Sequence, residues 1–193
     1  MVQVIDQLRL DHRNMRLLLA IVEDEMRVWR EGGVPDIDLL RTIAEYILHY
    51  PELVHHPKED LVFERLLRRD PEAKEVIRDL FEDHRQLAKL SSRFAAAIGN
   101  ATHDIQTRRE KLAPLAREYL LTYRLHMQVE EEQFLPRAMA VLTDEDWAEI
   151  DKKVAHVNDP LFGMKVAEAF LSLHKRILKT REIESAIRQF LSD

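Results

Sequence analysis

The chain has 193 residues, a formal net charge of −6 at pH 7 and no cysteine, and 46% of its residues are hydrophobic. A chain of this length and apolar content is expected to fold as one domain with a buried core, to which a short appendage is added. The absence of cysteine excludes disulfides, iron–sulfur clusters and thiolate zinc sites. Lysine and arginine are scattered rather than gathered in a stripe, so we expect no nucleic-acid partner.

Two further observations concern membranes and export. The longest fully apolar run covers residues 17–22, which is far too short to span a bilayer, so we expect no membrane partner. The first residues combine neither the basic segment nor the apolar run of a secretory signal. We therefore expect a cytoplasmic protein.

The aliphatic residues recur every three or four positions and the chain has only four glycines, which together predict an all-α protein. Gly32, Gly33 and Pro35 are predicted to end the first helix. Pro51 and Pro57 interrupt the second helix, and we expect a kink between them. The long amphipathic helices are predicted at about residues 3–31, 37–68, 71–98 and 104–140.

The pattern changes after residue 140. Thr143 is predicted to cap a short helix that has Asp146 at its third position. A last amphipathic helix is predicted near residues 161–191, and it either covers the bundle or pairs two copies of the chain as a homodimer. We therefore predict two parts: residues 1–140 form an up-down-up-down four-helix bundle, and residues 141–193 form a C-terminal helical extension.

The strongest chemical signal is a His-x-x-x-Glu pair that occurs twice. His55 and Glu59 form the first pair, and His126 and Glu130 form the second. On a helix, residues four apart lie on the same face, so each pair presents one imidazole and one carboxylate together. Two metal ions a few Å apart repel each other, and carboxylates that bridge them are what such a pair requires.

The other two long helices each carry a single histidine, His12 and His84, on an apolar face. One such histidine is usually a core residue, but one on every helix, with two carboxylates that are costly to bury, favours a two-metal site. Imidazole and carboxylate ligands without thiolate suit iron, manganese or zinc. Tyr119 and Tyr123 precede His126 on its helix, and they either face this site or belong to the core.

These residues make the chain resemble the hemerythrin-like proteins of the bacterial HHE cation-binding group. The resemblance covers about residues 1–140, and it implies a non-haem centre of two iron ions joined by an oxo or hydroxo bridge. Glu59 and Glu130 would bridge the irons, with two histidines on each. The matching residues are Asp11-His12, His55-His56-Pro57-Lys58-Glu59-Asp60, Asp83-His84 and residues 126–136.

Two departures from the resemblance leave alternatives open. Oxygen-carrying hemerythrins have a fifth histidine one turn after that of the third helix, where this chain has Ala88, so one position is left to water, another side chain or an external ligand. They also take their last carboxylate one residue further along, which makes Glu131 a competitor of Glu130. Within the chain itself, His56 and Asp60 compete with His55 and Glu59.

The resemblance implies a protein that binds or senses O₂, NO or peroxide at an open iron position. The alternative is a di-iron enzyme of oxidative or nitrosative stress defence or of iron-centre repair. Repair-type relatives carry a cysteine-bearing N-terminal segment, which this chain lacks, so that version of the enzyme is disfavoured. A third hypothesis is an adaptor bundle that keeps the motif without using it.

Overall fold

A computed structural model describes residues 3–99, 105–154 and 157–179 of the chain, and for residues 105–111 it describes the backbone alone. The chain divides into two units between residues 156 and 157, and each is treated by itself. All regular elements of the described residues are helical, as predicted. None of the described helices is long and apolar enough to cross a membrane.

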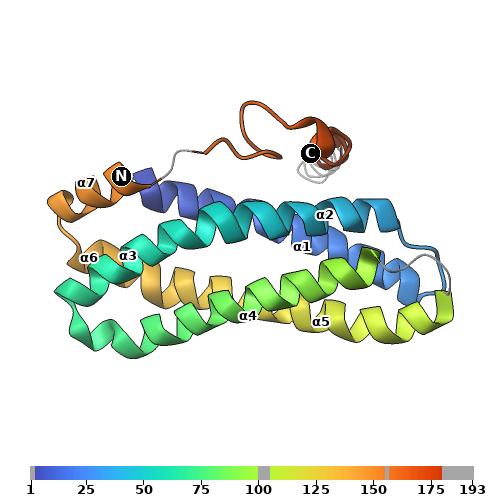
Figure 1. Ribbon diagram of the computed structural model, residues 1–193, viewed down its shortest axis with the longest axis horizontal. Coiled ribbons are helices and arrows are strands. Elements are labelled where there is room, and N and C mark those ends of the chain that lie inside the picture. Colours follow the sequence, from blue (N-terminus) through green and yellow to red (C-terminus); the bar gives the residue numbers. More distant parts are fainter. Residues whose placement is uncertain (1–2, 100–104, 155–156, 180–193) are drawn as a thin grey trace, which may run out of the picture. The chain divides into compact units, whose positions relative to one another are not determined.

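The first unit is a helical bundle (Figure 1). Its long elements form four continuous helical runs, which we call rods, and α4 packs against both α2 and α5 while α1 packs against α5. In chain order the rods are α1 (Gln3–Arg30); α2 (Ile37–Tyr50) with the π-helical turn η1 (Pro51–His55) and α3 (His56–Arg69); the 3-10 turn η2 (Pro71–Ala73) with α4 (Lys74–Gly99); and α5 (Ile105–Val129) with the π-helical turn η3 (Glu130–Phe134) and α6 (Leu135–Val141).

The helix boundaries follow from local signals. The first rod ends where Gly32 adopts a φ of 93°, which glycine tolerates without strain. Asp36 caps the second rod by accepting a hydrogen bond from the backbone N–H of Leu39 at 2.9 Å. The turn predicted after Gly99 falls on residues 100–104, which lie outside the described part of the chain.

The predicted kink in the second rod takes the form of a π-helical turn within a continuous helix. The backbone N–H of His56 bonds to the carbonyl of Pro51, five residues earlier. Pro57 follows directly; it has no N–H, and its ring crowds the carbonyl four residues before it. The hydrogen-bond ladder therefore widens by one residue at this place.

The fourth rod repeats this construction. The backbone N–H of Leu135 bonds to the carbonyl of Glu130, again five residues earlier, and Pro136 follows directly. The same proline effect accounts for this second π-helical turn. Both wide turns include residues with chemically active side chains, which places them beside the candidate site.

One cluster of the apolar core lies at the end of the bundle where α3, α4 and α6 meet. Phe63 and Phe134 make an edge-to-face contact there with ring centroids 4.4 Å apart. Burial of each such side chain contributes about 1.5–3 kcal/mol. The fully buried members of this core include Val62, Phe63, Leu66, Leu80, Phe134 and Leu135.

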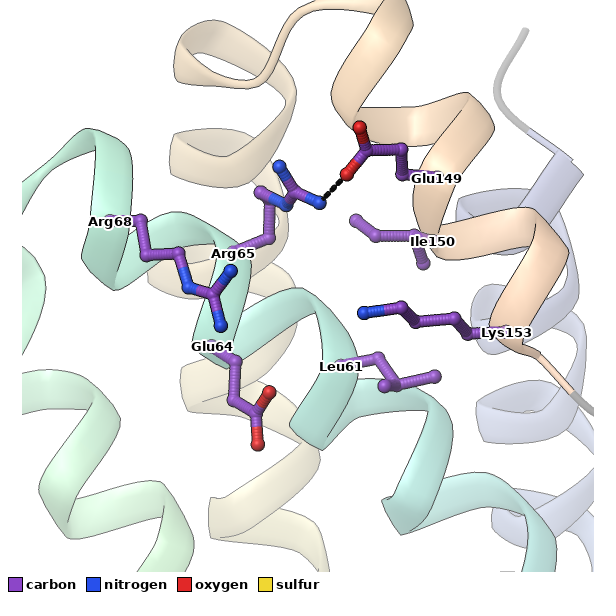
Figure 2. Close-up of a pocket in the computed structure, with 7 residues that line it drawn as sticks. All are labelled: Leu61, Glu64, Arg65, Arg68, Glu149, Ile150 and Lys153. Carbon is purple, nitrogen blue, oxygen red and sulfur yellow. Dashed lines mark hydrogen bonds and ion pairs between the residues drawn. The ribbon is translucent and has the colours of Figure 1, made fainter.

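The short helix α7 (Asp144–Lys153) packs on this core through Trp147 and is tied to α3 by ion pairs. Asp146 lies 3.1 Å from Arg65 and 2.9 Å from Arg69. Figure 2 shows Arg65 also reaching Glu149 across the space between the two helices. That space holds about 10 Å³, which is room for a single water molecule, so it belongs to the packing of α7 and is not a ligand site.

The cap predicted for α7 is present. The Thr143 side chain accepts a hydrogen bond from the backbone N–H of Asp146, and the Asp146 carboxylate accepts one from the backbone N–H of Thr143. The boundary predicted after residue 140 stays a prediction. The structure itself places α7 with the bundle and begins the second unit at Val157.

The second unit differs from the helix predicted near residues 161–191. Residues 160–165 form turns and bends, a 3-10 turn (η4, Glu168–Phe170) follows, and residues 171–179 are helical. Asp159 favours the turns at residues 160–165 over a helix, because its side chain accepts hydrogen bonds from the backbone N–H groups of Leu161 and Phe162 at 2.8 and 2.9 Å. Residues 180–191 of the predicted helix lie outside the described residues, and the homodimer contact stays a prediction.

Replacing Asp146 by asparagine removes the charge that joins the Thr143 cap to two arginines. We expect the free energy of unfolding at pH 7 to fall by about 1–2 kcal/mol in urea titrations. Arg69 lowers the pKa of Asp146 to about 2 from 3.8, so this stabilisation is present above pH 3.8 and is lost as pH falls towards 2. Glu145→Gln on the same helix is the control, and an equal loss there would contradict the role given to Asp146.

Candidate metal centre

Seven side chains with exposed fractions between 0 and 8% meet in the interior of the bundle. All four rods contribute, so the cluster exists only when the bundle is assembled. The members are His12 on α1, His55 at the end of η1, His56 and Glu59 on α3, His84 on α4, His126 on α5 and Glu130 at the start of η3.

Glu59 lies between imidazoles from different helices. Its Oε1 is 3.2 Å from Nε2 of His55 and 3.5 Å from Nε2 of His12. Its Oε2 points the other way and lies 3.4 Å from Nε2 of His84. The two oxygens of one carboxylate are thus shared between two sets of nitrogen donors.

Glu130 divides its oxygens in the same manner. Its Oε2 is 3.2 Å from Nε2 of His12. Its Oε1 is 3.1 Å from Nε2 of His126 and 3.5 Å from Nε2 of His84. Both carboxylates therefore connect the same two sets of imidazoles.

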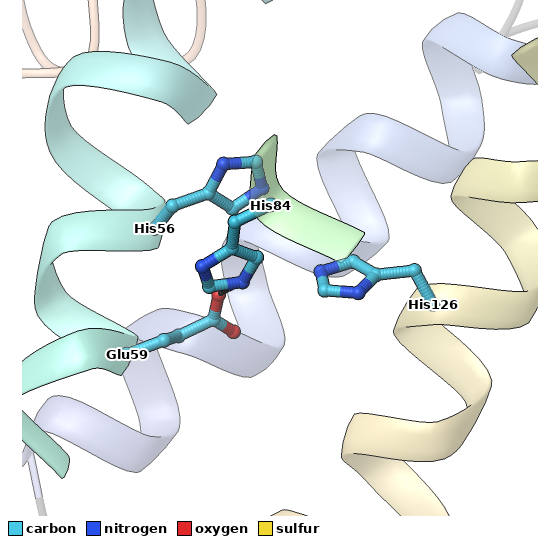
Figure 3. Close-up of side chains that lie close together, drawn as sticks. All are labelled: His56, Glu59, His84 and His126. Carbon is cyan, nitrogen blue, oxygen red and sulfur yellow. Dashed lines mark ion pairs between the residues drawn. The ribbon is translucent and has the colours of Figure 1, made fainter. Parts of the chain in front are cut away.

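We call these sets the two-histidine group and the three-histidine group. His12 and His55 form the first, with ring centroids 4.9 Å apart. The second consists of His56, His84 and His126, which gather around Glu59 in Figure 3. Within it, the rings of His56 and His84 are stacked with centroids 4.2 Å apart.

The six ligands predicted from the sequence all lie in this cluster, whereas their acidic competitors do not. Glu131 lies outside it, with one oxygen 3.1 Å from Nδ1 of His12 and both oxygens bonded to Arg16. Asp60 likewise lies outside, 3.1 Å from Nδ1 of His84. Each competitor thus contacts Nδ1 of a histidine in the cluster, whereas Nε2 of the same ring faces the central glutamates.

His56 is the residue whose place the sequence left open. It was considered as a substitute for His55, but both side chains are buried in the cluster, with exposed fractions of 4% and 1%. On a regular helix adjacent side chains diverge by about 100°. The wide turn η1 ends at His55 and turns the chain by less per residue, so both can face inward. Pro57 produces this turn, and it is the feature of the sequence that could have indicated the inward position of His56.

Five carboxylates surround the cluster, one behind each imidazole, and we call them the outer carboxylates. Such a partner fixes the ring orientation of a metal-binding histidine and makes it a stronger ligand. The distances from Nδ1 to the nearest oxygen are 3.1 Å for His12–Glu131, 3.2 Å for His55–Asp11, 3.1 Å for His84–Asp60, 3.6 Å for His126–Asp83 and 3.4 Å for His56–Glu52.

The arrangement is a two-fold repeat in chemistry. In the first half, His12 is a candidate ligand and the preceding Asp11 is the outer carboxylate of His55 on the next rod. In the second half, His84 and Asp83 have the same two roles, with Asp83 behind His126. Asp60, which follows Glu59, contacts His84 of the second half, and Glu131, which follows Glu130, contacts His12 of the first half. His56 breaks the repeat, because the equivalent position on α5 is Met127.

The carboxylates and imidazoles of the cluster shift each other's pKa values. Burial lowers the pKa of His84 and His126, but the carboxylates facing each ring raise these values to about 12 and about 9. Burial raises the pKa of Glu59 and Glu130, yet the surrounding imidazoles hold both well below the ordinary value. With no metal bound, ionised carboxylates thus face protonated imidazoles.

The donor atoms fit a metal. Among the described residues, both oxygens of Glu59 and of Glu130, and Nε2 of His12, His84 and His126, are buried and make no hydrogen bond. Buried polar atoms are nearly always hydrogen-bonded, so a set of buried donor atoms without such bonds, aimed at one another, fits a bound cation. Nitrogen and carboxylate donors without thiolate match the preference of iron, manganese or zinc.

The chain was compared with families of known proteins, with curated proteins and with solved structures. A family model described as the hemerythrin HHE cation binding domain covers residues 3–138. No curated protein and no solved structure matches the chain.

Metal binding to this cluster should release protons and weaken as pH falls. The rings of His84 and His126 are protonated at pH 7, because their pKa values are about 12 and 9, and a metal binds only the deprotonated nitrogen. Calorimetric titration with Zn²⁺ in two buffers of different ionisation enthalpy measures the protons released, and the affinity should still be rising with pH at about 9, because His84 keeps its proton there. Equal binding enthalpies in both buffers would contradict this assignment.

Proposed function

Because the chain belongs to the hemerythrin HHE cation-binding family, we propose that it holds two iron ions and binds a small oxidant or diatomic ligand, O₂, NO or peroxide, at an open iron position. The ligands are the six predicted side chains, with His56 as a seventh. The proposal includes an up-down-up-down order of the four rods and an oxo or hydroxo bridge between the irons.

One observation carries the proposal: each central glutamate divides its oxygens between the two histidine groups. Glu59 directs Oε1 to His55 and His12 and Oε2 to His84. Glu130 does the same from the opposite rod. A single cation needs no such pair of shared carboxylates, whereas two adjacent cations are held together by them.

The open position belongs to the two-histidine group. That group offers two imidazole nitrogens and two carboxylate oxygens, and the three-histidine group offers one nitrogen more. Non-haem iron with few histidine and carboxylate ligands keeps positions open for external molecules. Iron bound there would supply reversible binding or electron transfer, while the bundle orients the imidazoles and excludes bulk water.

The second candidate is an enzyme that consumes the same ligand in oxidative or nitrosative stress defence. The observation that favours it is Tyr123, a buried and oxidisable side chain whose hydroxyl contacts an outer carboxylate, Glu52, at 3.4 Å. Spectral changes that O₂ or NO produces reversibly, without turnover, support the binding protein. Repeated consumption of peroxide or NO supports the enzyme.

Protein produced in iron-supplemented medium should contain about two irons per chain and show near-ultraviolet bands of an oxo-bridged ferric pair. His126→Ala should lower both the iron content and the melting temperature, because metal binding is linked to folding; at a metal concentration 100-fold above Kd the linked stabilisation is about 2.7 kcal/mol. His49→Ala is the control, since His49 is exposed and bonds to the Glu45 carbonyl. Unchanged iron content in His126→Ala would overturn the site.

A further inference from the structure

The third rod lacks the second histidine that oxygen-carrying hemerythrins have there, and His56 from the second rod lies beside His84 instead. Ala88, one turn after His84, has no donor atom in its side chain. His56 on α3 instead stacks its ring on that of His84, with centroids 4.2 Å apart and planes 14° apart. A ring nitrogen of His56 lies within the same set of potential ligand atoms as Glu59, His84 and His126.

His56 is not explained as a hydrogen-bonded core residue. It is 4% exposed, and neither of its ring nitrogens makes a hydrogen bond to the described residues. An imidazole buried in this way costs free energy unless something binds it. The closest polar group behind it is Glu52, whose Oε2 lies 3.4 Å from Nδ1. This leaves Nε2 as the nitrogen available to a metal.

Glu52 is held from two sides. It lies in the π-helical turn η1, one turn before His56 on the same rod. From the fourth rod, the hydroxyl of Tyr123 donates a hydrogen bond to Oε1 at 3.4 Å. No arginine or lysine in the described part of the chain pairs with Glu52, so no such cation competes with His56 for its carboxylate.

The hydroxyl of Tyr123 is a dependable donor in this place. The side chain is 1% exposed, and burial raises its pKa well above 10, so it keeps its proton. It stands one turn before His126 on α5, which supplies another member of the three-histidine group. In the two-fold repeat, Tyr123 and Glu52 occupy equivalent positions, and the two meet between the rods.

We propose that Glu52 and Tyr123 are positioning residues that hold His56 as the third imidazole of the three-histidine group. The inference rests on the proposed metal centre and deepens it. With His56 in place, one metal position is filled by side chains and external ligands are confined to the two-histidine group. There the residue equivalent to His56 is Met127, whose thioether is a poor ligand for the same ions.

The test uses Co²⁺ as the probe, with metal-free full-length protein titrated against a competing chelator. The absorption bands of Co²⁺ report the ligands of each ion, which a general loss of stability does not alter. We expect His56→Ala and Glu52→Gln to weaken one of two cobalt sites by about 10–100-fold and to leave the other unchanged. Tyr123→Phe should weaken the same site to a smaller degree.

Tyr119→Phe is the matched control for Tyr123→Phe. Tyr119 lies one turn earlier on α5 and is equally buried, but its hydroxyl makes no hydrogen bond to the described residues. Added imidazole should restore the wild-type cobalt spectrum in His56→Ala, because it can occupy the vacated volume. It should not do so in Glu52→Gln, where the ring of His56 still fills that volume.

The outcomes separate the two proposals. A wild-type protein that binds fewer than two cobalt ions overturns the proposed function and this inference with it. A wild-type protein that binds two ions, with affinities and spectra unaltered in His56→Ala or Glu52→Gln, overturns this inference and removes His56 from the ligand set, while the two-metal centre with its six predicted ligands stands. An effect of Tyr119→Phe as large as that of Tyr123→Phe would also reject it, since of these two tyrosines Tyr123 is the one whose hydroxyl bonds to Glu52.

Discussion

Two carboxylates with no exposure to solvent, Glu59 and Glu130, impose the constraint on which the rest of the bundle depends. An ionised carboxylate is costly to bury, and two of them side by side repel each other. The protein meets this cost with five imidazoles, drawn from every rod, whose Nδ1 atoms are backed by five further carboxylates. The carboxylates raise the pKa of four of these imidazoles, those of His12, His55, His84 and His126, and the protons that these rings hold can be exchanged for cations.

The outer carboxylates also brace the bundle. Asp11 on the first rod reaches His55 on the second, and Asp60 on the second reaches His84 on the third. Asp83 on the third rod contacts His126 on the fourth, and Glu131 on the fourth contacts His12 on the first, which completes the ring of contacts. Because four of the five contacts join different rods, the residues that orient the candidate ligands also fix the relative positions of the helices.

Much of this could be predicted from the sequence, because helical periodicity and an i, i+4 spacing are local properties. The first helix, the cap at Thr143 and the membership of six side chains in one cluster followed from such patterns. The inward orientation of His56 could not be predicted, since regular geometry turns it away from His55. The start of the last helix was also misplaced, because side-chain hydrogen bonds from Asp159 override the apolar spacing.

The two π-helical turns have a consequence for how the length of this chain can change. One residue inserted into a regular helix rotates everything beyond it by about 100°, which would carry Glu59 or the packing face of α6 out of register. A wide turn absorbs the additional residue locally, so the helix on either side keeps its phase. The second and fourth rods each contain one additional residue in a π-helical turn. In the second rod this additional residue allows two adjacent histidines to face inward.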